Sequence, residues 1–281
     1  MTALAPPALR VATLHDRALM RVSGPDWRAF LQGLLSQDVL TLGAGELRFA
    51  ALLNPQGKLL FDLFVLGQDE GCLLDVAADR RADLARRLTL YRLRAKVEIA
   101  ETPEAAQAAW NTDGPLGGEW LRDPRLPDLG YRGYGAAAPQ GAAPSGPDDY
   151  ARHRLALGVP DAGRDCPPET HYPIEANFDL LNGIDFKKGC FVGQETTSRM
   201  KRRGVVRTRM LPIRFEGPPP AYGAEVLAGE LRAGETRCGG EDHSMALLRL
   251  DRIEAAPLTV EGRAVRAERP GYFGDWAVAE T

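Results

Sequence analysis

The cysteine at position 190 lies in a stretch whose residue types could support thiol chemistry. It stands between Gly189 and Phe191 in KKGCFVGQETTSRMKRRG, residues 187–204. Gly189 and Gly193 let other groups approach the backbone closely, and the residues after Gly193 read as a helix. A helix N-terminus and the neighbouring lysines both favour the thiolate, so the stretch predicts a reactive cysteine. The competing explanation is a small packed side chain, because free cysteine is among the most buried residue types.

Asp62 is a second candidate, because it interrupts the apolar stretch LLFDLFVL. A buried charge without a partner costs several kcal/mol, so Asp62 must be paired, hydrogen-bonded or face a cavity. Just before this stretch, Asn54 and Gly57 belong to NPQG, a combination typical of turns. A plain hairpin turn is therefore the competing explanation for Asn54 and Gly57.

Positive charge is concentrated beside Cys190. Residues 187–209 contain eight basic residues and one acidic residue, whereas the whole chain has a formal net charge of −3, so the remainder is acidic. This distribution indicates a localised anionic partner rather than a chain-wide nucleic-acid surface. Glu195 and Arg199 have the spacing of a surface ion pair on a helix. The alternative is that they and Gln194 form the rim of a pocket with Cys190.

The remaining cysteines and histidines form no metal-binding pattern. The four cysteines are far apart and include no C-x-x-C pair, and the four histidines are scattered. Cys166 and His171 are close in sequence, but two ligands do not make a site. The sequence therefore predicts free thiols in a reducing compartment and no metal centre.

Composition sets the broad class of the protein. The chain has 281 residues, of which 44% are hydrophobic and 26% charged, a balance typical of soluble globular proteins. Its length predicts two or three subdomains. The first thirty residues lack the pattern of a secretory signal, and no apolar run reaches the roughly 20 residues of a membrane span. We expect a cytoplasmic protein without a membrane partner.

The elements that must position these residues follow from periodicity and turn signals. The sequence predicts strands at 19–22, 72–77 and 94–100, a hairpin over 47–66, and helices over 25–35, 79–90, 148–158 and from 193. Residues 135–147, GAAAPQGAAPSGP, read as a mobile loop. From residue 205 to 281, short strands broken by EGPPPAYG, LRAGET and ERPGYFGD are typical of a small β-barrel or sandwich.

The motif KGCFVGQE resembles the signature of the YgfZ-type folate-binding proteins, whose mitochondrial relatives assist iron–sulfur cluster assembly. VSGPDWRAFLQGLLSQDV, NPQGKLLFDLFVL and YRLRAKVEI occur in the order that this family shows. The first two also resemble the glycine-cleavage T-protein, an aminomethyltransferase that uses tetrahydrofolate. The resemblance implies an α+β fold of antiparallel sheets with flanking helices, arranged as a ring around a folate-lined channel. It implies a folate-binding core of two interleaved subdomains over residues 1–204 and a C-terminal β-barrel over 205–281.

The resemblance also assigns binding residues. Glu175, in YPIEANF, matches a glutamate that holds the pterin in the T-protein, and one carboxylate can accept the two adjacent N–H groups of that ring. Its competing role is an acid at a helix N-terminus. The T-protein has two adjacent acids where this chain has Phe61 and Asp62, so folate binding is expected but aminomethyl transfer is in doubt. Further residues expected around tetrahydrofolate or a derivative are Asn54, Lys188, Gln194, Glu195 and Arg199.

Three functions compete at this point. The first is a folate-binding accessory protein for iron–sulfur cluster assembly or repair, with iron–sulfur clients or assembly proteins as partners and an indirect effect on tRNA modification. The second is a tetrahydrofolate-dependent aminomethyltransferase. The third is a tRNA-binding protein, which the basic run 201–203 favours only weakly because no aromatic residues interleave it. The run is otherwise a solvated face, an anchor for the folate glutamate tail or a protein contact.

Overall fold

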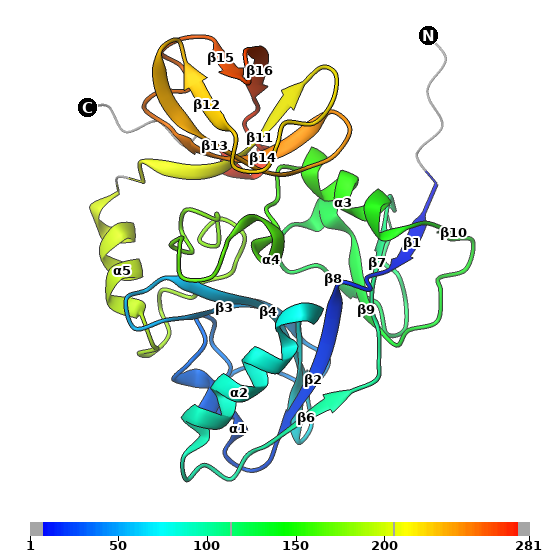
Figure 1. The fold of residues 1–281 in the computed structure, drawn as a ribbon. Helices are drawn as coiled ribbons and strands as arrows, with labels where there is room; N and C mark the ends of the chain where they lie inside the picture. Colours follow the sequence, from blue (N-terminus) through cyan, green and yellow to red (C-terminus); the bar gives the residue numbers. More distant parts are fainter. Residues whose placement is uncertain (1–7, 113, 205, 275–281) are drawn as a thin grey trace.

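The computed structural model describes residues 8–112, 114–204 and 206–274. In this part of the chain there are two five-stranded sheets, a closed six-stranded barrel and five α-helices (Figure 1). The predicted α+β class with a C-terminal barrel is confirmed.

The first sheet is antiparallel and carries the predicted hairpin. In spatial order its strands are β3 (Leu47–Leu53), β4 (Leu59–Gln68), β5 (Gly71–Ala77), β2 (Arg17–Ser23) and β6 (Glu98–Thr102). The turn between β3 and β4 closes with the Gly57 N–H donating to the Asn54 carbonyl oxygen at 2.9 Å. Gly57 has a φ of 82°, a conformation that favours glycine. The hairpin signal NPQG is therefore confirmed.

Both faces of this sheet are covered, one by helices and the other by a segment of turns. This explains why β4 is apolar along almost its whole length. On one face lie the helices α1 (Trp27–Gln32) and α2 (Arg81–Arg92), where Leu63 packs with Leu84 and Leu88. On the other face, Phe49 and Phe64 pack against Phe178. Figure 1 shows α1 and α2 on the side of the sheet away from the barrel.

The segment 166–193 fills the space between this sheet and the barrel, and it consists of turns without helix or strand. Short helices lead into it and out of it: α3 (Pro147–Ala156), α4 (Ala162–Asp165) and α5 (Gln194–Arg203). Single-turn 3₁₀ helices occur at Ala78–Arg80, Pro127–Leu129 and Gly271–Phe273. This segment contains Glu175 and Cys190, so irregular backbone positions both candidate groups.

A second sheet stands beside the first. In spatial order its strands are β10 (Ala143–Pro144), β1 (Arg10–Thr13), β7 (Ala106–Trp110), β9 (Tyr131–Tyr134) and β8 (Leu121–Arg122). Only β10 and β1 pair in parallel among the described strands of this sheet. Residues 135–147, predicted as a loop, thus contribute one two-residue strand, and Pro147 already begins α3.

The C-terminal barrel closes through β16 and β11. Around the barrel the strands are β11 (Thr208–Phe215), β14 (His243–Arg249), β13 (Leu231–Gly239), β12 (Glu225–Ala228), β15 (Leu258–Val260) and β16 (Arg263–Ala267). Every described pair is antiparallel. LRAGET was predicted as a break but lies inside β13. The reason is that a Cβ on Gly234 would lie 2.0 Å from the Leu247 carbonyl oxygen, so glycine here permits close strand approach.

Two other element predictions need correction. The helix predicted over 25–35 begins at Trp27 and ends at Gln32, because Leu35 forms a bridge with Leu52 of β3 instead of continuing the helix. The strand predicted over 94–100 is displaced to 98–102, where it pairs with β2. The helices over 79–90 and 148–158 and the strand over 72–77 are confirmed with small shifts of their ends.

Candidate functional site

Cys190 is exposed on the loop that precedes α5. The helix begins after Gly193, whose φ is 80°, and the Gln194 N–H donates to the Phe191 carbonyl oxygen at 3.2 Å. The amides of the first helical turn therefore face this loop. The packed alternative for Cys190 is wrong, since the side chain is open to solvent and can meet a partner.

The loop rests on the hairpin turn of the first sheet. A Cβ on Gly193 would lie 2.6 Å from the Asn54 carbonyl oxygen, and a Cβ on Gly57 would lie 2.9 Å from the Thr196 Cβ. Asn54 is buried, and its Oδ1 accepts the Lys58 N–H at 2.8 Å. Asn54 thus shapes the turn, and the turn in turn supports the start of α5.

Lys188 fastens the same loop to the first helix. Its Nζ donates to the carbonyl oxygen of Gln32, the last residue of α1, at 2.7 Å and to that of Leu35, three residues further on, at 2.5 Å. Burial lowers the pKa of Lys188 to about 8. The ammonium group was expected around folate, but in this structure it donates to the last carbonyl of α1 and to that of Leu35.

Glu175 lies in the turn segment, half-buried, where its Oε2 accepts the Tyr172 N–H at 2.8 Å. Burial raises the pKa of this carboxyl, and the N–H bond and nearby Lys58 partly offset the rise. Lys58 Nζ lies 3.6 Å from the centroid of the Tyr172 ring. The reading of Glu175 as an acid at a helix N-terminus is wrong, because the residues around it form turns.

Sequence reasoning missed the polar group that joins Glu175 to the barrel. His171 Nε2 is 3.1 Å from Arg237 Nη2, and His171 Nδ1 is 4.0 Å from Glu175 Oε2. Burial, Arg237 and Lys58 lower the pKa of His171 to about 4, so the ring is neutral at neutral pH. Nε2 then accepts from arginine and Nδ1 carries the proton.

Asp62 belongs to a buried network of charges between the two sheets. Its Oδ2 accepts from Arg17 Nη1 at 2.8 Å, and Arg17 Nε donates to Asp75 Oδ1 at 2.5 Å. Arg132 Nη1 donates to the other Asp75 oxygen at 2.7 Å, and Arg132 Nε approaches Asp123 at 3.3 Å. Burial alone would lower the pKa of Arg17, but Asp62 and Asp75 outweigh it and raise the pKa. The paired state expected for Asp62 is what the structure contains.

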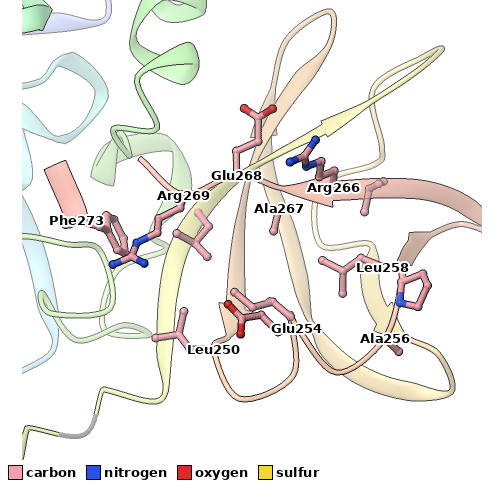
Figure 2. A pocket seen from close by; sticks show the side chains of 13 residues that line it. Leu250, Glu254, Ala256, Leu258, Arg266, Ala267, Glu268, Arg269 and Phe273 are labelled. Carbon is pink, nitrogen blue, oxygen red and sulfur yellow. The ribbon is translucent and has the colours of Figure 1, made fainter. Parts of the chain in front are cut away.

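The space beside Asp62 is small. It measures about 30 Å³, and its lining includes Arg17, Phe64 and Tyr150 but neither Glu175 nor Cys190. The three candidate groups therefore do not share this cavity. A larger hollow of about 360 Å³ opens in the barrel, where Leu258, Ala267 and Phe273 contribute apolar surface (Figure 2). It contains none of the residues predicted for the site.

On α5 the candidate residues face different surroundings. Glu195 and Arg199 are exposed and form no ion pair in the described part of the chain, so the predicted surface pair is wrong, whereas Gln194 is half-buried. Lys201 Nζ lies 3.7 Å from Asp179, which also pairs with Arg209 at 2.8 Å. Among the described residues, no three His, Cys, Asp or Glu side chains gather to hold a metal ion. None of the described helices has the length and apolar character needed to cross a membrane.

Comparison with known proteins identifies the family. Residues 207–275 match the family model of the CAF17 C-terminal beta-barrel domain. The chain is 34% identical over 276 residues to the iron–sulfur cluster assembly factor IBA57, mitochondrial, of Homo sapiens, covering 86% of this chain and 78% of that protein. This chain belongs to the IBA57/CAF17/YgfZ family. The resemblance found in the sequence is therefore confirmed.

Two further likenesses extend this result. The Mus musculus protein of the same name is 32% identical over 285 residues, covering 88% of this chain and 79% of that protein. The crystal structure of the glycine cleavage system aminomethyltransferase T from Bartonella henselae superposes with a TM-score of 0.75 at 17% identity, covering 94% of this chain and 86% of that one. The T-protein-like fold of this family member is thus confirmed. The IBA57 relatives are named mitochondrial, and the cytoplasmic location expected here stays a prediction.

Cys190 of this IBA57/CAF17/YgfZ family member is expected to react with a maleimide reagent before the other cysteines at neutral pH. Burial raises the pKa of Cys72 to about 12 and that of Cys166 well above its usual value. Burial and the nearby Asp165 and Asp161 raise that of Cys238 to about 11. Less thiolate and less access should slow all three. Mass spectrometry of labelled peptides over time checks the order. Labelling of the urea-unfolded chain is the control. If Cys238 were labelled as fast as Cys190 in the folded protein, the predicted order would be wrong.

Proposed function

We propose that this chain is a folate-binding accessory factor for the assembly or repair of iron–sulfur clusters. The observation that carries the proposal is the exposed Cys190 thiol on a loop held at both ends, by Lys188 on α1 and by Gly193 on the hairpin turn. A fixed, accessible thiol suits chemistry on an iron, sulfur or one-carbon species. The names of the IBA57 relatives support the same role. Any effect on tRNA modification would be indirect, through iron–sulfur enzymes.

Glu175 has the free hydrogen-bonding capacity that binding a pterin requires. Its Oε2 accepts one backbone N–H, and no donor contacts Oε1 among the described residues. A half-buried carboxylate with spare lone pairs can accept the amino group and the ring N–H of a pterin together. The adjacent Tyr172 offers an aromatic face, although Lys58 now covers one side of it. We assign Glu175 to orient tetrahydrofolate or a derivative, which when bound supplies a carrier of one-carbon units.

The space at Asp62 does not fit the same ring. Its volume of about 30 Å³ has room for only about two water molecules, whereas a pteridine has two fused rings. The Asp62 carboxylate also forms an ion pair with Arg17. We therefore derive no step in which Asp62 touches folate, and we assign it to hold Arg17 in the buried network.

Asn54 and Lys188 position the Cys190 loop in this proposal, Asn54 through the hairpin turn and Lys188 through its hydrogen bonds to Gln32 and Leu35. Gln194, Glu195 and Arg199 would border an incoming partner, because α5 follows the loop directly. Iron–sulfur clients or assembly proteins are the partners we infer. The aminomethyltransferase alternative has the T-protein-like fold in its favour, but the first acid of the pair is replaced by Phe61. That ring is buried under the Arg80 guanidinium, 4.7 Å from its centroid.

Loss of the Glu175 carboxylate is expected to weaken tetrahydrofolate binding by roughly 10- to 100-fold, because charge-assisted hydrogen bonds contribute about 1.5–3 kcal/mol. Isothermal titration of wild type, Glu175→Ala and Glu175→Gln measures this. Glu230→Ala, at an exposed barrel position, is the matched control and should bind like wild type. Equal affinities for wild type and Glu175→Ala would remove the pterin assignment. The Cys190 labelling order would stand, so the two parts of the proposal fail separately.

A further inference from the structure

A groove beside α2 takes no part in the site described above. It has a volume of about 480 Å³ and lies between one side of α2, the start of β4 and the turn at Pro168. Its full lining is Leu60, Phe61, Arg80, Asp83, Arg86, Arg87, Leu90, Tyr91, Pro168 and Glu169. Asp83, Arg87 and Leu90 follow one another at helical spacing along this wall. The groove is therefore a concave strip with an apolar floor and a charged helical wall.

The surface around this groove is strongly basic. Residues 80–96 contain seven basic residues and one acidic residue, so basic residues are denser here than in residues 187–209 around Cys190. The Asp83 carboxylate already forms ion pairs with Arg86 Nη1 at 2.8 Å and with Arg80 Nε at 3.7 Å. Arg87 is half-buried and has no acidic partner among the described residues. Glu169 is the second acid of the lining, so the excess of charge in the groove remains positive.

Two leucines at the end of α2 face solvent. Leu90 is 71% exposed and Leu93 is 87% exposed, the two highest values among the large hydrophobic side chains of the described residues. Leu93 also has a φ of 45°, in the left-handed region that branched side chains rarely adopt. Exposed leucines among arginines are unfavourable for an isolated soluble surface, and they suit a surface that is covered by a partner.

We propose that this groove binds an acidic amphipathic segment of a partner protein. Apolar side chains of the segment would enter between Leu90, Tyr91 and Pro168, and its carboxylates would pair with Arg87 and the arginines beyond Leu90. A protein segment fits better than a membrane surface because the groove is concave, whereas a bilayer surface is broad and cannot enter it. The proposal does not depend on folate or on Cys190.

The test uses the full chain and three labelled synthetic helical peptides in fluorescence anisotropy. One peptide carries leucine at helical spacing with glutamate elsewhere, the second has lysine in place of glutamate, and the third has alanine in place of leucine. We expect binding of the first peptide alone, weakened as salt rises. Leu90→Ala should weaken it about tenfold, whereas Leu231→Ala, at a 60% exposed leucine on the barrel, should not. Arg87→Glu should abolish it, with Arg266→Glu as the matched control.

Four results would overturn the proposal. These are no binding of the acidic leucine peptide, equal binding of the lysine peptide, equal losses for Leu90→Ala and Leu231→Ala, or binding to phosphatidylserine vesicles without binding to the peptide. Circular dichroism of each variant verifies that the fold is kept, which the exposure of Leu90 and Leu231 favours.

Discussion

Replacing Asp75 with asparagine is expected to lower the free energy of unfolding by about 3–5 kcal/mol, because it removes one partner from a buried ion pair. The Asp75 carboxylate is 1% exposed and accepts from Arg17 on one oxygen and from Arg132 and the Tyr134 hydroxyl on the other. A neutral amide would leave two buried guanidinium groups with less compensation.

Urea unfolding followed by circular dichroism measures this loss. Asp83→Asn is the control, since Asp83 pairs with Arg86 at an exposed position where ion pairs contribute about 0–1 kcal/mol. If Asp75→Asn cost no more than Asp83→Asn, the network between the two sheets would not hold them together in the way we describe.

Gly193→Ala is expected to destabilise the chain by about 3 kcal/mol and to change the labelling rate of Cys190. The φ of 80° costs a non-glycine residue about 1–2 kcal/mol. In addition, the new Cβ would lie 2.6 Å from the Asn54 carbonyl oxygen and 3.0 Å from the Leu53 Cβ, so backbone must move. That movement would detach the start of α5 from the hairpin turn.

Gly204→Ala separates these two causes. Gly204 ends α5 with a φ of 68°, but a Cβ there would meet nothing within 4 Å. It should therefore cost only the conformational part, about 1 kcal/mol, and leave the Cys190 labelling rate unchanged. Equal effects of the two variants on stability and on labelling would show that the contact with Asn54 does not position the loop.

The elements that the sequence predicted well have local signals. The hairpin of β3 and β4 depends on NPQG between two apolar runs, and the barrel depends on short strands separated by glycine and proline. The second sheet went unrecognised because β7, AQAAW, shows neither alternation nor β-branched residues. Its neighbours β1 and β9 are distant in sequence and only four residues long, so their pairing leaves no local trace.

The sequence predicts which residues of the candidate site need partners, but it does not identify partners that are distant along the chain. A carboxylate in an apolar strand indicates that Asp62 needs a partner, but nothing in the sequence says that the partner is Arg17, 45 residues away. Asp75 carries the same signal, a carboxylate within the apolar strand GCLLDVA, and the same argument would have found it. The role of Lys188 is equally hidden in the sequence, because nothing local indicates that its ammonium donates to the Gln32 and Leu35 carbonyl oxygens.

The attachment of Lys188 to α1 also affects the order of events on the ribosome. Its two hydrogen bonds join residues 156 and 153 positions apart, so the first helix is made long before the segment that completes its end. Until that segment emerges, the nascent N-terminal sheet exposes one face and an uncapped helix terminus. Contacts of such long range slow folding, and a ribosome-bound intermediate without the last third of the chain should need chaperone protection.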